Sequence, residues 1–98
     1  MSVSLEIQRT EAGHRGAWFS EQNGERIAEM TFTRVNPTTV IIDHTEVSDS
    51  LKGQGAGRQL LDAAVKWARE TGTKFIPVCP YAKAQFEKDP SIRDVLST

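Results

Sequence analysis

The stretch that decides the fold is Lys52-Gly53-Gln54-Gly55-Ala56-Gly57, between a segment rich in β-branched residues and a segment of helical periodicity. Its glycines occupy alternate positions. Glycine adopts the backbone angles of a tight loop and carries no side chain that would keep a ligand away. Several main-chain N–H groups can therefore converge on one anion, and the start of the following helix adds donors and the positive end of its dipole. The stretch indicates a phosphate-binding loop or a plain strand-to-helix turn.

Two other phosphate-binding patterns do not fit this loop. The P-loop of nucleotide-binding proteins has Lys followed by Ser or Thr after its last glycine, whereas Arg58-Gln59 follow Gly57 here. The dinucleotide pattern spaces its glycines as G-x-G-x-x-G inside an early βαβ unit, and this chain has neither feature. Nucleotide hydrolysis and dinucleotide binding are therefore not indicated.

Four strands are predicted before the loop from period-two alternation and β-branched residues: Val3–Gln8, Gly16–Ser20, Glu25–Arg34 and Thr38–Val47. Asn23-Gly24 lies between the second and the third, and this pair tolerates the positive φ angles of a tight hairpin turn. We expect the four segments to form an antiparallel meander.

The segment after the loop changes to helical spacing. Apolar residues recur at this spacing over Gly55–Thr71, Lys74–Cys79 predicts a short strand, and Pro80–Lys88 predicts a second helix. Ile92–Leu96 would add a helical turn or a docked tail. The expected fold is one α+β domain over residues 1–98, with a mixed, mainly antiparallel sheet in the order β-β-β-β-α-β-α and helices packed on it.

Composition excludes several classes of protein. Twelve Lys and Arg against 13 Asp and Glu give a net charge of −1, which provides no broad basic surface for nucleic acid or an anionic membrane. The single cysteine, Cys79, cannot form an internal disulfide or a multi-cysteine metal site, and it suits a reducing compartment. No signal segment or spanning apolar run is visible. We expect a cytoplasmic protein without a metal, as a monomer or weak homodimer.

The segment Val47–Gly57 resembles the CoA-binding motif of the GNAT N-acetyltransferase superfamily. In that motif a strand ends on Val, turns, and continues as Arg/Gln-x-x-Gly-x-Gly/Ala into a helix. His44-Thr45-Glu46 before the loop, Leu60-Leu61 in the helix and Pro77–Tyr81 after it are similar to the truncated, YjdJ-type branch. Lys52 stands where the superfamily usually has Arg or Gln, which keeps a charge and loses a bidentate fork.

The resemblance implies acetyl-CoA as the co-substrate and a primary amine, on a small molecule, a protein lysine or an N-terminus, as the acceptor. It implies that the pantetheine arm runs along the strand ending at Val47 and enters a gap where the next strand splays away. The residues expected to line the pantetheine are Glu46, Val47 and Ser48. Those expected to line the phosphates are Lys52, Gly53, Gln54, Gly55, Ala56, Gly57 and Arg58.

Candidate proton acceptors lie on the strand before the loop. Strict alternation would place Val40, Ile42, His44 and Glu46 on one face, apolar at first and polar toward the loop. His44 could take a proton from the amine near neutral pH, and Glu46 could do so directly or through water. The alternative is that both are solvent-exposed side chains that contribute only solubility.

Cys79 is the third catalytic candidate. It precedes Pro80, so it is expected at the N-cap of a helix, where the dipole favours the thiolate. It could carry the acyl group transiently or polarise the site, or it could be a small buried packing residue. Tyr81 could protonate the CoA thiolate, although the family's tyrosine lies deeper in this helix, where Phe86 stands. The alternatives to an enzyme are a CoA-binding module without turnover and an interaction domain in which the loop is only a turn.

Overall fold

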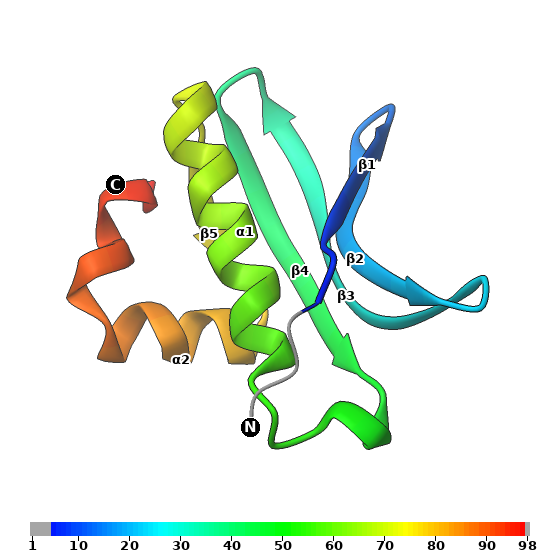
Figure 1. The fold of residues 1–98 in the computed structure, drawn as a ribbon. Helices are drawn as coiled ribbons and strands as arrows, with labels where there is room; N and C mark the ends of the chain where they lie inside the picture. Colours follow the sequence, from blue (N-terminus) through cyan, green and yellow to red (C-terminus); the bar gives the residue numbers. More distant parts are fainter. Residues whose placement is uncertain (1–4, 98) are drawn as a thin grey trace.

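The structure, a computed structural model, describes residues 5–97 and contains one five-stranded sheet with helices packed on it (Figure 1). The strands are β1 (Gln8–Ala12), β2 (Arg15–Gln22), β3 (Glu25–Asn36), β4 (Thr39–Val47) and β5 (Lys74–Pro77). The helices are the 3-10 helix η1 (Asp49–Leu51), α1 (Ala56–Thr71), α2 (Pro80–Lys88) and the 3-10 helix η2 (Pro90–Val95). This confirms the α+β fold predicted from the sequence.

The strands lie in the order β1-β2-β3-β4-β5, antiparallel except for the parallel pair β4 and β5. The parallel pair arises because α1 crosses over between these two strands. The two-residue turn between β2 and β3 is the expected one, since Asn23 and Gly24 both have positive φ angles, 54° and 78°.

The first predicted strand is wrong. Residues 1–4 lie outside the described part, and Leu5 and Ile7 belong to no strand but pack against the core. The strand that pairs with β2 is the more polar segment Gln8–Ala12. The pairing begins with Ala12 opposite Arg15, across a turn in which Gly13 has a φ angle of 62°. Turn geometry sets the register here, and the apolar Leu5 and Ile7 cover the core without joining the sheet.

One hydrophobic core joins the sheet to both α-helices. Phe32, Met30, Ile42, Leu60 and Phe75 are fully buried in it, and Ala82 and Phe86 of α2 belong to the same cluster. Figure 1 shows α1 lying along the sheet, with α2 at the end of β4 that leads into the loop. Gly72 ends α1 with φ 70° and donates its N–H to Ala68 O. No helix within residues 5–97 is long and apolar enough to cross a membrane.

A β-bulge in β4 changes which side chains face the core. Phe32 pairs with Ile42 but Thr31 pairs with His44, so Asp43 is an additional residue in β4. Met30, on the core face, pairs with Thr45, which places Thr45 and Val47 on the core side of the sheet. The prediction that His44 and Glu46 share a face with Val40 and Ile42 is therefore wrong, because the bulge reverses the alternation between them.

Candidate active site

The three glycines of the loop have different structural roles. Gly53 and Gly55 have φ angles of 79° and 77°, the left-handed region that other residues rarely adopt. A Cβ at either position would meet nothing within 4 Å, so both face open space. Gly57 lies inside α1, and a Cβ there would stand 2.9 Å from Cζ of Tyr81. The first two glycines thus shape the loop, whereas the third makes room for the tyrosine ring.

The loop offers main-chain donors at the start of α1. The first hydrogen bond of this helix runs from Gln59 N to Gly55 O at 3.0 Å, so the N–H groups of Ala56, Gly57 and Arg58 precede the helical ladder. Lys52 N and Gln54 N, in contrast, donate to main-chain oxygens within the turn itself, at 3.3 and 3.2 Å. The expected donors of Lys52 and Gln54 are therefore used by the protein, and the open donors gather at the helix N-terminus.

Strands β4 and β5 separate next to the loop. They pair only from Thr39 to Ile42, while β4 continues to Val47. Beyond the pair, Val78 N and Cys79 N both donate to Ile42 O, at 3.1 and 3.0 Å, and the chain turns away into α2. Within the described residues, no strand lies beside this edge of β4 after Ile42. An extended chain could pair with this free main-chain edge.

A cavity of about 320 Å³ lies between the free edge and the loop. Tyr81 forms one wall, and burial raises the pKa of its phenol, so the hydroxyl remains protonated at neutral pH. The residues lining the cavity are Thr45, Val47, Leu51, Lys52, Gly53, Gly55, Ala56, Gly57 and Tyr81. It combines an apolar floor with the open amides, which suits a ligand with an anionic end and a less polar arm.

Cys79 is at the predicted N-cap of α2, with Pro80 as the first helical residue. Its thiol is buried, 2% exposed, and lies 3.2 Å from Oγ1 of Thr45, which reaches the cavity. The thiol therefore contacts Thr45, which lines the cavity, but does not line the cavity itself. This geometry fits a packing residue at least as well as an acyl carrier.

His44 and Glu46 form a pair on the opposite side of β4 from Cys79. Nε2 of His44 lies 3.2 Å from Oε1 of Glu46, and the two side chains are 60% and 67% exposed. Glu46, Val47, Ser48 and Lys52 also help to line a second hollow of about 400 Å³. The predicted catalytic residues are thus divided between two sides of one strand, joined by its free main-chain edge.

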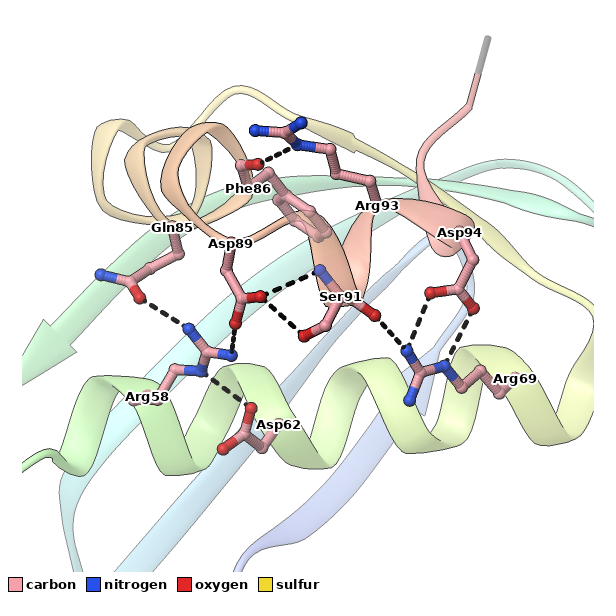
Figure 2. A network of polar contacts seen from close by, with 9 residues as sticks. All are labelled: Arg58, Asp62, Arg69, Gln85, Phe86, Asp89, Ser91, Arg93 and Asp94. Atoms are coloured by element: carbon pink, nitrogen blue, oxygen red, sulfur yellow. Dashed lines mark hydrogen bonds and ion pairs between the residues drawn. The ribbon is translucent and has the colours of Figure 1, made fainter.

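The Arg58 side chain points away from the loop, toward α2 (Figure 2). Its guanidinium donates to Asp62 at 2.9 Å, to Gln85 at 3.0 Å and to Asp89. Hydrogen bonds from Ser91, and then from Arg58, hold the pKa of Asp89 at about 2. The sequence suggested that Arg58 lines the phosphates, but only its main-chain N–H is placed for that. Lys52 pairs with Asp49 at 2.8 Å on the surface, and an exposed pair of this kind contributes little to stability.

Two residues of the site were missed or underrated from the sequence. Thr45 was not identified because strict alternation pointed it away from the cleft, and the bulge at Asp43 reverses this. Tyr81 stands apart from the family's usual tyrosine position in the sequence, yet it lines the cavity and packs against Gly57. A polar Asp43 in the middle of an apolar strand was the available signal for the bulge.

Comparison with known proteins decides the family. The profile of the GCN5-related N-acetyl-transferase family matches residues 17–95, which is most of the chain. The chain belongs to the GCN5-related N-acetyltransferase family. A GCN5-like protein from Staphylococcus aureus, solved by NMR, supports this with 38% identity over 95% of this chain and 88% of its own, at a TM-score of 0.73.

More distant members share the family's fold. The aminoglycoside N-acetyltransferase AAC(6')-Iy, solved with CoA, is 14% identical over 89% of each chain, with a TM-score of 0.56. A GNAT-family acetyltransferase from Elizabethkingia anophelis, solved with acetyl-CoA, is 22% identical over 65% of this chain and 42% of its own, with a TM-score of 0.55. No curated protein matches the chain. The fold thus occurs in a relative of similar length, the Staphylococcus aureus protein, and as part of a longer one, the Elizabethkingia enzyme.

Proposed function

We propose that the chain is an acetyl-CoA-dependent N-acetyltransferase that transfers an acetyl group to a primary amine. One observation carries this proposal: the free edge of β4 leads into a glycine loop that lines a cavity, and the open amides at the start of α1 lie beside it. Two relatives of the same fold were solved with CoA or acetyl-CoA, which supports this co-substrate. The composition further supports a cytoplasmic location.

The residues fit the shape of CoA in two parts. The left-handed Gly53 and Gly55 and the N–H groups of Ala56, Gly57 and Arg58 would hold the pyrophosphate at the positive end of α1. The main chain of Glu46, Val47 and Ser48 would pair with the pantetheine amides along the free edge. Bound there, acetyl-CoA would supply the activated acyl thioester. The sulfur end would then lie near the point where β4 and β5 separate.

Acid and base functions fall on opposite sides of β4. Transfer forms a C–N bond and breaks the C–S bond, and the amine loses a proton while the thiolate gains one. Glu46, alone or through His44, would take the proton on the exposed side, where the two side chains pair. Tyr81 would give a proton on the cavity side, which its protonated phenol supports. Cys79 is proposed to support the site through Thr45, with acyl transfer to its sulfur as the alternative.

The proposal is tested by calorimetry with acetyl-CoA on Gly55→Glu and on a matched control, Gly72→Glu. Both glycines have left-handed backbones, at φ 77° and 70°, and open space around the missing Cβ. Both substitutions therefore introduce the same strain and charge, but only Gly55 lies in the loop. We expect binding to be lost in Gly55→Glu and retained in Gly72→Glu. Equal affinity in both variants would refute the loop as the CoA site.

A binding module without turnover is the second candidate function. It is favoured by the exposure of His44 and Glu46 and by the burial of Cys79, since none of these three candidates is among the described residues that line the cavity. Thiol release from acetyl-CoA in the presence of polyamines, amino acids and lysine peptides separates the two. Amine-dependent release supports the transferase, and tight binding without release supports the module.

A further inference from the structure

The far end of α2 is held against the start of α1 by one arginine. Arg58 uses Nε, Nη1 and Nη2 for three different partners: Asp62 on its own helix, Gln85 in α2 and Asp89 at the end of α2 (Figure 2). The Arg58 side chain is 32% exposed and that of Asp89 is 26% exposed, so the contact is half-buried. Such a multiply bonded guanidinium restricts both position and angle, which a point charge does not.

Asp89 extends this contact to the following segment. Its second carboxylate oxygen accepts hydrogen bonds from Ser91 N at 3.0 Å and Ser91 Oγ at 2.6 Å, which begins η2. The end of α2, the start of η2 and the first turn of α1 therefore meet at one carboxylate. The first turn of α1 is also the anion-facing end of the candidate site.

The near end of α2 carries Tyr81. Its ring packs against Gly57, one residue before Arg58, and forms a wall of the cavity. Because α2 has only nine residues, the angle at which its far end docks determines where its second residue lies. The contact at Arg58 therefore helps to orient the helix that carries Tyr81, together with the buried Ala82 and Phe86.

We propose that Arg58 is a positioning residue, which clamps α2 through Gln85 and Asp89 and so keeps the Tyr81 hydroxyl at the cavity for the departing thiolate. The role of the hydroxyl rests on the proposed function, whereas the clamp itself does not. Arg58 therefore serves the reaction indirectly, and its side chain is not a phosphate ligand. This explains why an arginine in the first turn of α1 faces away from the loop.

The chain provides a matched control in Arg69. This residue also ties α1 to the C-terminal segment, with hydrogen bonds to both oxygens of Asp94 at 2.9 and 2.8 Å and to Ser91 O at 2.8 Å. It lies three turns from Arg58 along α1 (Figure 2), and it does not line the cavity. Arg58→Lys and Arg69→Lys therefore both keep the positive charge and lose the several donors of the guanidinium group. Only Arg58→Lys should change the position of Tyr81.

The readout is the titration of Tyr81, the only tyrosine of the chain, followed by tyrosinate absorbance. Burial makes the largest contribution and raises the pKa of Tyr81. The charge of Arg58 lowers this pKa, and Asp62 and Cys79 raise it. Loss of the clamp would expose the ring while a positive charge remains nearby. We expect the pKa of Tyr81 to fall toward about 10 in Arg58→Lys and to stay unchanged in Arg69→Lys.

Turnover gives the second readout. With the best amine acceptor, kcat should fall about ten-fold in Arg58→Lys with little change in the KM for acetyl-CoA, and Arg69→Lys should stay within two-fold of the parent. If Arg58→Lys does not fold, Asp89→Asn removes the partner carboxylate instead. Identical tyrosine titrations in the Arg58 and Arg69 variants would overturn the clamp. Absence of turnover in the parent would refute the proposed function, and the titration would still decide the clamp.

Discussion

Replacing Gly57 by alanine tests whether the third glycine exists to seat Tyr81. The new Cβ would lie 2.9 Å from Cζ, 3.1 Å from the hydroxyl oxygen and 3.2 Å from Cε2, and ordinary contact begins at 3.4 Å. The ring must therefore retreat by about 0.5 Å, the difference between 3.4 and 2.9 Å. Overpacking of this kind costs about 1–3 kcal/mol. The gain in helix propensity from glycine to alanine is about 1 kcal/mol.

The gain in helix propensity offsets part of the overpacking cost, so the clearer effect should appear in the rate of the reaction. We expect the free energy of unfolding to fall by no more than about 2 kcal/mol, the difference between these terms. A misplacement of about 1 Å can cost 10²-fold in rate, so a shift of half that size should lower kcat about ten-fold. The assay is urea unfolding together with thiol release from acetyl-CoA.

A double-mutant cycle supplies the control. In a Tyr81→Ala background the collision is absent, and Gly57→Ala should then stabilise the protein by about 1 kcal/mol. Stabilisation by the same amount with Tyr81 present, and unchanged turnover, would show that the ring is not seated against this glycine.

Three further predictions concern residues on β4 and at the end of α2. Thr45→Val should lower the free energy of unfolding in urea by about 0.5–1 kcal/mol, because it removes the hydroxyl that contacts the Cys79 sulfur. Thr45→Ser keeps this hydroxyl and should keep the stability. Equal losses in the two variants would exclude the contact. The pKa of Asp89 is about 2, below its ordinary value of 3.8, so its contribution to stability is complete above about pH 4 and is lost as the pH falls through about 2. Thermal melts from pH 5 to pH 2 should show this loss in the parent, and a parallel loss in Asp89→Asn would assign it to other groups. Glu46→Gln should lower kcat about 10²-fold without changing the affinity for acetyl-CoA. Glu29, which pairs with Glu46 across the strands, is the control, and Glu29→Gln should leave kcat unchanged. Equal losses of kcat in both variants would show that Glu46 is not the base.

Local signals predicted the helices and the loop well. The apolar stripe and the terminal Gly72 gave α1 to within one residue, and Pro80 gave the start of α2. Left-handed angles at Gly53 and Gly55 follow from the residue type alone. Each of these features depends on residues only a few positions apart, so the sequence contains the information directly.

The side-chain orientation along β4 could not be predicted in the same way. It depends on the bulge at Asp43, which arises from pairing with β3, a partner elsewhere in the chain. One additional residue placed Thr45 in the cavity and moved His44 and Glu46 to the other side. The orientation of the Arg58 side chain was missed for a similar reason, because Gln85 in α2 and Asp89 just after it lie 27 and 31 positions away.

The most direct measurement is a titration of the ¹⁵N-labelled protein with acetyl-CoA, followed by amide chemical shifts. We expect saturable one-to-one binding, with the largest shifts at Gly53, Gly55 and Ala56–Arg58 and along Glu46–Ser48 on the free edge of β4. No saturable change at near-millimolar acetyl-CoA, or changes confined to other surfaces, would contradict it.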